Sequence, residues 1–107
     1  MWAISPIMPI VVVAFHLPIG APKEVHRDFH RAVYGEETSS WGGRYRYRRR
    51  GLLDDIPHVR VYWGLVLLRA RDLPLLRKLL EAYSAEYFVR EIKPLKEDLV
   101  GLGVQLQ

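Results

Sequence analysis

The chain has 107 residues, of which half are hydrophobic and 26% are charged. This length and composition predict one globular domain over residues 1–107, and they exclude a disordered, a collagen-like and a membrane-spanning chain. The absence of cysteine excludes disulfide frameworks, thiolate zinc sites and cysteine nucleophiles.

We expect a cytoplasmic protein, because a chain without cysteine suits a reducing compartment and no segment suits export or membrane insertion. The first basic residue is Lys23, so the apolar segment before it lacks the basic start of a signal peptide. Residues 1–7 are expected to form an unstructured extension, with Met8 as an alternative to Met1 as the natural start. Asparagine is absent and arginine outnumbers lysine twelve to four, a composition typical of a thermophile.

The first elements in chain order are an apolar strand and an amphipathic helix. Residues 10–17 (IVVVAFHL) form a continuous apolar run, which is typical of a strand in the centre of a sheet. In residues 23–34, Val25, Phe29 and Val33 recur at helical spacing, which predicts a helix with one buried face.

A polar segment then separates this helix from the next apolar run. Residues 36–43 are loop by composition. Residues 44–50 (RYRYRRR) alternate with a period of two, which predicts a strand polar enough to lie at a sheet edge. A wide turn over residues 51–57 precedes a second central strand over residues 58–68.

The rest of the chain predicts a leucine-rich helix over residues 73–83, a half-polar strand over 86–92 and a short tail strand over 100–106. The resulting order, β-α-β-β-α-β with a tail strand, predicts an α+β domain of the ferredoxin-like type. In that topology the two apolar strands are central and the two charged strands are edges, which agrees with the composition of each strand.

The positive charge of the protein comes from one segment. Sixteen basic and twelve acidic side chains give a net charge of +4, and five of the basic ones fall within residues 44–50. Without that segment the chain has a net charge of −1. A local basic patch interleaved with tyrosine predicts a nucleic-acid-binding surface, with arginine on phosphates and aromatic rings on bases. The predicted contact residues are Arg44, Tyr45, Arg46, Tyr47, Arg48, Arg49 and Arg50, with Tyr62 and Trp41 as further stacking candidates.

Two simpler interpretations of the same segment remain open. Charged residues protect a sheet edge against aggregation, although one or two charges are enough for that purpose. An arginine row also suits pairing with an acidic protein, which would make the chain a dimerisation module without nucleic acid.

The histidines are the candidate catalytic and metal-binding residues. His26 and His30 lie four residues apart, a spacing that places both on one helix face, and they are candidates for metal ligands. His16 ends the first strand, where the predicted topology brings it near Arg44 and Glu86. The alternative interpretation is that His26 and His30 are boundary residues beside the apolar stripe of the helix and that His16 is a capping or surface histidine.

The first strand carries the sequence VVVAFHLP, and a helix, a hairpin, a leucine-rich helix, a half-polar strand and an apolar tail follow it. This order resembles the small dimeric ferredoxin-like nucleases and integration subunits of the CRISPR adaptation system. It also resembles the related virulence-associated protein D toxins. The resemblance has an archaeal character and covers roughly residues 8–106. It implies a homodimer, in which each tail strand pairs with the sheet edge of the other subunit, and a surface that faces nucleic acid. In that family the first strand ends in an aromatic residue and a metal-binding aspartate, whereas here Phe15 is followed by His16.

We therefore predict a cytoplasmic homodimer that binds DNA or RNA, spans no membrane and needs no cofactor. Binding without cleavage is the expected behaviour. The alternative is a divalent-metal-dependent endonuclease that uses His16 with His26, His30 or Asp28, and imidazole ligands suit zinc, manganese or nickel better than magnesium.

Overall fold

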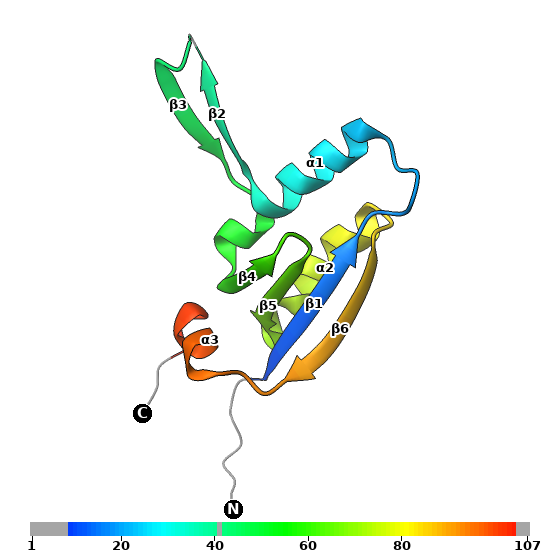
Figure 1. Cartoon of the computed structure of the whole chain (residues 1–107), viewed down its shortest axis with the longest axis vertical. Helices are drawn as coiled ribbons and strands as arrows, with labels where there is room; N and C mark the ends of the chain where they lie inside the picture. The colour runs from blue at the N-terminus through cyan, green and yellow to red at the C-terminus, as the bar shows by residue number, and fades with distance from the viewer. Residues whose placement is uncertain (1–8, 41, 105–107) are drawn as a thin grey trace, which may run out of the picture.

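The computed structural model describes residues 9–40 and 42–104. Within these ranges the chain forms a four-stranded antiparallel sheet, a separate two-stranded hairpin and three α-helices, which confirms the predicted α+β class (Figure 1). The strands are β1 (Ile10–His16), β2 (Glu36–Ser40), β3 (Tyr45–Arg49), β4 (His58–Tyr62), β5 (Leu65–Arg69) and β6 (Glu86–Ile92). The helices are α1 (Lys23–Tyr34), α2 (Leu73–Ala82) and α3 (Lys96–Gly101), with the short 3-10 helices η1 (Leu52–Asp55) and η2 (Ala70–Asp72).

The sheet has the strand order β4-β5-β1-β6, and all neighbouring strands are antiparallel. The strands with the most continuous apolar sequence, β1 and β5, lie in the centre, because only there are both faces of a strand covered. The predictions that the first strand is central and that residues 86–92 form an edge strand are confirmed.

The main core lies between one face of the sheet and the helices α1 and α2. Alternate residues of β1 point into it, including Val13, which is fully buried. Phe29 and Val33 from α1 and Leu76 and Leu80 from α2 fill the other side, as their helical spacing predicts.

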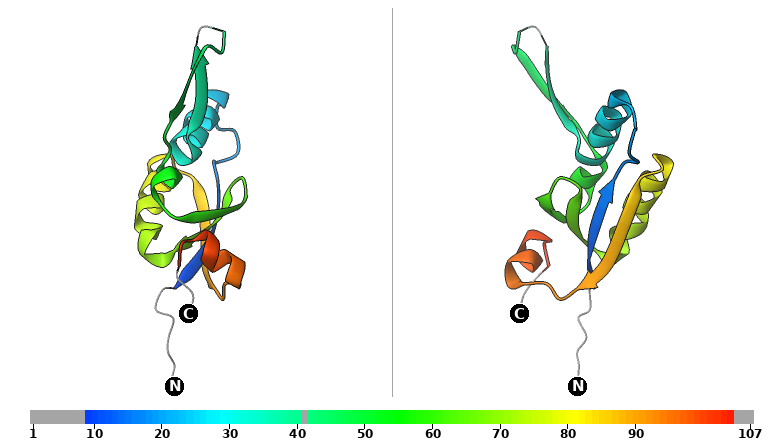
Figure 2. Two further views of the ribbon diagram at one scale, coloured as in Figure 1. Left: turned by 90° about the vertical axis from the view of Figure 1, so that its left-hand side faces the viewer. Right: turned by 45° about the vertical axis from the view of Figure 1, so that its right-hand side comes forward.

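The opposite face of the sheet is partly covered by α3, which lies on the other side of the sheet from α2 (Figure 2). Here Ile10, Leu67 and Leu102 form a second, smaller buried cluster. The prediction of a tail strand over residues 100–106 is therefore wrong for residues 100–104, the part of this segment that the structure describes. Its alternating sequence fits a strand, but Leu99 and Leu102 are also three residues apart. A helix that ends at Gly101 therefore packs the partly buried Leu99 and the buried C-cap residue Leu102 against the sheet.

The predictions for residues 36–68 are also wrong in detail. Residues 58–68 form two strands and not one, because Gly64, at φ 81°, allows a tight turn after Trp63. The second strand of the sheet is therefore β4. Residues 44–50 are not an edge of the sheet. They contain β3 (Tyr45–Arg49), which pairs with β2 in the stretch expected to be a loop.

Strands β2 and β3, together with the described turn residues 42–44 between them, form a ribbon that is here called the arm. It extends away from the sheet beyond the C-terminal end of α1 (Figures 1 and 2). The remainder of the described chain is here called the body. The predicted wide turn after the arm contains η1, whose Leu53 is buried in the main core together with Ile56. The chain is therefore anchored in the body immediately after it leaves the arm.

Candidate functional site

The arm presents two chemically different faces. All residues of β3 are exposed. Because side chains alternate along a strand, Arg46 and Arg48 belong to one face and Tyr45 and Tyr47 to the other, as the sequence pattern predicts. The two tyrosines are 59% and 54% exposed. A ligand that contacts both rows must therefore reach both faces of the ribbon.

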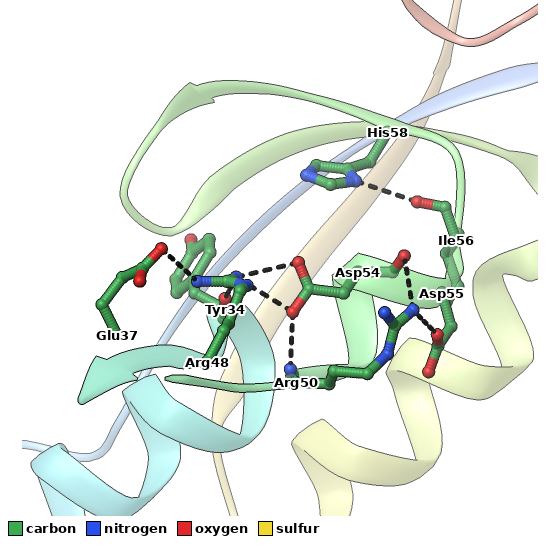
Figure 3. Close-up of polar contacts among 9 residues, drawn as sticks. Tyr34, Glu37, Arg48, Arg50, Asp54, Asp55, Ile56 and His58 are labelled. Atoms are coloured by element: carbon green, nitrogen blue, oxygen red, sulfur yellow. Dashed lines mark hydrogen bonds and ion pairs between the residues drawn. The ribbon is translucent and has the colours of Figure 1, made fainter. Parts of the chain in front are cut away.

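Arg48 lies at the base of the arm and is bound to the body. Its Nη2 donates to Oδ1 and Oδ2 of Asp54, at 2.8 Å and 2.9 Å, and to the carbonyl oxygen of Tyr34 at 2.7 Å (Figure 3). Its Nη1 lies 3.9 Å from Oε1 of Glu37. The hydrogen bond from Arg48 holds the pKa of Asp54 below its usual value, and the same bond raises the pKa of Arg48.

Two further ion pairs hold the base of the arm. Arg50 donates to the carboxylate of Asp55 and, at 3.3 Å, to the carbonyl oxygen of Asp54 (Figure 3). Nε of Arg31, in α1, lies 3.4 Å from Oε2 of Glu36, the first residue of β2. The arginine-rich segment is thus partly neutralised by carboxylates close to it in the fold.

The remaining arginines of the segment, Arg44, Arg46 and Arg49, have no carboxylate within 4.0 Å among residues 9–40 and 42–104. Arg44 lies in the turn between the two strands, and the other two lie on β3. These three cations are the part of the predicted binding row that remains available to an outside ligand.

The two ends of the arm meet at a pair of glycines. A Cβ on Gly51 would lie 2.1 Å from the backbone nitrogen of Gly35, and a Cβ on Gly35 would lie 2.6 Å from the carbonyl oxygen of Arg49. Oδ2 of Asp54 accepts a hydrogen bond from the N–H of Gly51 at 2.8 Å. Backbone therefore packs directly against backbone at this neck, which only residues without a side chain permit.

An open pocket of about 700 Å³ lies at the foot of the arm. It is formed by the end of α1, the start of β2, the end of β3, η1 and the β4–β5 hairpin. The lining residues are His30, Tyr34, Gly35, Glu36, Glu37, Arg48, Leu53, Asp54, His58, Arg60 and Trp63. Several separate segments of the chain thus contribute to one cavity.

Aromatic side chains are stacked along one wall of this pocket. The ring of Trp63 lies 4.7 Å from that of Tyr34, edge to face, and 4.6 Å from that of His30. The guanidinium of Arg60 lies 3.9 Å above the indole, in cation–π geometry. Trp63 nevertheless remains 58% exposed, so this wall can accept another planar group.

Hydrogen bonds fix the orientation of two other lining residues. Nδ1 of His58 donates to the carbonyl oxygen of Ile56 at 2.9 Å, which leaves Nε2 as the free acceptor (Figure 3). The hydroxyl of Tyr34 accepts from the N–H of Gly64 at 2.6 Å. Burial raises the pKa of Tyr34, although the Gly64 N–H and the charge of Arg60 act in the opposite direction.

Sequence reasoning did not select several lining residues of this pocket, among them His58, Arg60 and Trp63. The apolar pattern places all three in one continuous strand, in which a tryptophan looks like a core residue. The available signal was the pair Trp63–Gly64, since a glycine inside an apolar run marks a turn and a tryptophan in a turn is exposed.

His16 has one of its two predicted neighbours. Its Nε2 lies 3.4 Å from Oε1 of Glu86, and its Nδ1 donates to the carbonyl oxygen of Leu17 at 2.8 Å. Arg44 lies in the arm and not in the sheet, so the predicted proximity of Arg44 to His16 rested on the wrong strand assignment. The catalytic role of His16 stays a prediction.

His26 and His30 have different surroundings despite their spacing. His30 packs against Tyr34 and Trp63 in the pocket, whereas His26 lies beside Lys23 and Arg27 near the start of α1. No group of three His, Cys, Asp or Glu side chains suited to hold a metal occurs in the described part of the chain.

Some predicted features lie outside the described residues: the extension over residues 1–7, the alternative start Met8, the stacking candidate Trp41, and the last residues of the tail. Of the helices in the described ranges, none has the length and apolar character needed to cross a membrane.

Comparison with known proteins gives no relative: no family model, no curated protein and no solved structure matches the chain. The candidate site is therefore defined by its geometry alone.

Proposed function

We propose that the protein binds nucleic acid by inserting its arm into a groove of a duplex. The observation that carries this proposal is a two-stranded ribbon that stands clear of the body and bears three arginines without carboxylate partners among the described residues. A hairpin without a core of its own is marginally stable in water, so an extended one fits a role in contacting a partner. The major groove of B-form DNA, about 12 Å wide, admits a two-stranded ribbon.

The two faces of the arm favour a groove over a flat surface. A single strand lying along one face would contact either Arg46 or the tyrosine pair, because the two rows point in opposite directions. The two walls of a groove flank an inserted ribbon on both sides, so Arg46 and Arg49 can each approach a phosphate backbone.

The strand order supports the finer fold assignment. The sheet strands β1, β4, β5 and β6 correspond to the first to fourth strands of a β-α-β-β-α-β unit, and their spatial order, read from the β6 edge, is then fourth, first, third, second. We propose a ferredoxin-like domain in which the arm is an insertion between α1 and the second strand. The resemblance to the CRISPR-associated subunits stays a prediction.

We also propose that two copies associate through the free edge of β6. This strand has seven residues and a hydrogen-bonded neighbour only on its β1 side within the described sheet. An exposed edge of this length can pair with an identical strand across a twofold axis. Sedimentation of the full chain at rising concentration tests this, and a mass that stays at one chain throughout would contradict it.

A charge-matched pair of triple variants tests the binding proposal. The arm variant changes Arg44, Arg46 and Arg49 to Gln. The control changes Arg71, Lys78 and Lys93 to Gln; these are exposed cations of the body without carboxylate partners among the described residues, so both proteins lose the same charge.

Duplex affinity is then measured by fluorescence anisotropy over a range of salt concentrations. The slope of log K against log salt should become shallower by about 0.9 for each phosphate that the arm variant no longer neutralises. The control should keep the slope of the wild type. Equal weakening of both variants would show that binding depends on net charge and not on the arm.

A further inference from the structure

The arginine face of the arm leads directly into the pocket at its foot. Glu37 and Arg48, which belong to this face, also line the pocket. Arg46, two residues further along β3, borders a shallow hollow that includes Glu37 as well. A polynucleotide held against this face of the arm therefore passes the mouth of the pocket.

The wall of the pocket suits a planar ring. The indole of Trp63 is more than half exposed although His30, Tyr34 and Arg60 all contact it. Aromatic rings and stacked guanidinium groups are the surfaces on which unpaired bases stack in nucleic-acid-binding proteins. A base that is paired inside a duplex cannot reach such a surface.

The polar groups around this wall suit the rest of a nucleotide. Arg60 has no carboxylate within 4.0 Å among the described residues, and its guanidinium is held in place by the indole, so it can bind a phosphate. Nε2 of His58 is a free acceptor, and the side chain of Glu37 is 76% exposed. These two groups can accept hydrogen bonds from the N–H groups on the edge of a base.

From this arrangement we propose that the pocket binds one unpaired nucleotide next to the duplex that the arm holds. A pocket of about 700 Å³ has the size of a small-molecule site. The inference rests on the proposed function, and it adds a preference: the protein selects duplexes that carry an unpaired nucleotide over fully paired ones.

The test compares a blunt duplex with the same duplex carrying a short unpaired adenine tail. For the wild type we expect about tenfold tighter binding to the tailed duplex, since stacking of one base contributes that much to affinity. Trp63→Ala and Arg60→Gln should each bring the ratio of the two affinities close to one. Arg60→Gln is the milder change, because it leaves the packing of Trp63 on Tyr34 in place.

A matched control is available in the body, away from the pocket and from β6. Arg71, in η2, is exposed and has no carboxylate within 4.0 Å among the described residues. Arg71→Gln removes one positive charge, as Arg60→Gln does, and it should keep the wild-type preference for the tailed duplex. A loss of preference in this variant would show that the effect does not belong to the pocket.

The outcomes separate the two proposals. Equal affinity of the wild type for both duplexes would overturn the pocket assignment and leave the arm proposal intact. If neither duplex binds, the proposed function is overturned. Binding of adenosine monophosphate alone then tests the pocket as a nucleotide site. A titration that shifts the His58 ring signals in the wild type but not in Trp63→Ala would support a nucleotide site, and unchanged signals would overturn it.

Discussion

The body and the arm are stabilised in opposite ways. In the body, two apolar clusters lie on the two faces of one sheet. They contain buried residues of the central strands β1 and β5 and of the helices α1 and α2. In the arm, no residue of β3 is buried, and among the described strands β2 and β3 pair only with each other. Burial therefore determines the conformation of the body, whereas the position of the arm depends on a few contacts at its neck.

This difference shows which substitutions can leave the stability of the fold unchanged. A side chain in the body is fixed by many neighbours, so its removal leaves a cavity. The side chains of β3, in contrast, are all exposed. Substitutions in β3 are therefore expected to change the surface of the arm with little change in folding. Each prediction below tests a different part of this contrast.

The largest effect is expected for Leu80→Ala. Leu80 is fully buried between α2 and the sheet, so the cavity left by this change should lower the free energy of unfolding by about 2–5 kcal/mol. Leu75→Ala is the control, because Leu75 lies on the same helix and is 53% exposed. Denaturant unfolding measures both, and similar decreases for the two variants would contradict the proposed core.

A smaller decrease is expected at the neck for Gly51→Ala. The new Cβ would overlap the backbone of Gly35 and Tyr34, which should cost roughly 3 kcal/mol and shift the start of the arm. Gly20→Ala is the control, because it causes backbone strain without a close contact. A Cβ at Gly20 meets no atom within 4 Å, but its φ is 91°, so only about 1 kcal/mol is expected there. Thermal unfolding compares the two, and a milder Gly51→Ala would rule out the close contact.

The pH dependence of the neck is the next test. The pKa of Asp54 is lowered in the folded state, so its interactions with Arg48 and Gly51 stabilise the protein above the unfolded pKa of about 3.9, and this stabilisation is lost as pH falls through the folded pKa. Asp54→Asn should therefore be less stable than the wild type near pH 7, by about 1 kcal/mol, and the difference should disappear in acid. Melting temperatures from pH 7 to pH 2 measure this. Glu24→Gln, at an exposed carboxylate of α1, is the control, and a constant difference between Asp54→Asn and the wild type would contradict the linkage.

The smallest effect on stability is expected for the Gln variant of Arg44, Arg46 and Arg49. Exposed charges without partners contribute little to folding, so its unfolding free energy should stay within about 0.5 kcal/mol of the wild type. Arg48→Gln should lower it by more, because Arg48 binds Asp54 and the Tyr34 carbonyl. Equal stabilities of these two variants would mean that Arg48 does not fix the arm to the body.

The sequence predicted the elements that carry an apolar pattern within their own residues. The apolar run of β1 and the stripes of α1 and α2 each carry their own signal, and all three are confirmed. The arm was missed because β2, EETSS, has no intrinsic tendency to form a strand and exists through its pairing with β3. The misplacement of β3 in the sheet followed from reading residues 58–68 as one strand, which left one sheet position unfilled.

For the candidate site, local patterns predicted local features and failed for the pocket. The alternation of arginine and tyrosine in β3 is present. The proximity of His16 to Glu86 is also present, but its prediction came from the expected strand order and not from a local pattern. The pairing of Arg48 with Asp54 and the contact of Trp63 with His30 depend on the turn at Gly64 and on the position of η1. No spacing in the sequence encodes contacts between segments that only the folded chain brings together.

The neck has a further consequence for how this molecule can change. The backbone enters the arm at Gly35 and leaves it at Gly51, and these two points touch. A short turn between them would close the chain, so the body does not need the arm in order to be continuous. Lengthening or replacing the segment between the glycines should therefore leave the other elements in place, because none of them lies within that segment. The arm is in this sense an exchangeable attachment, and the same body could carry a different ribbon.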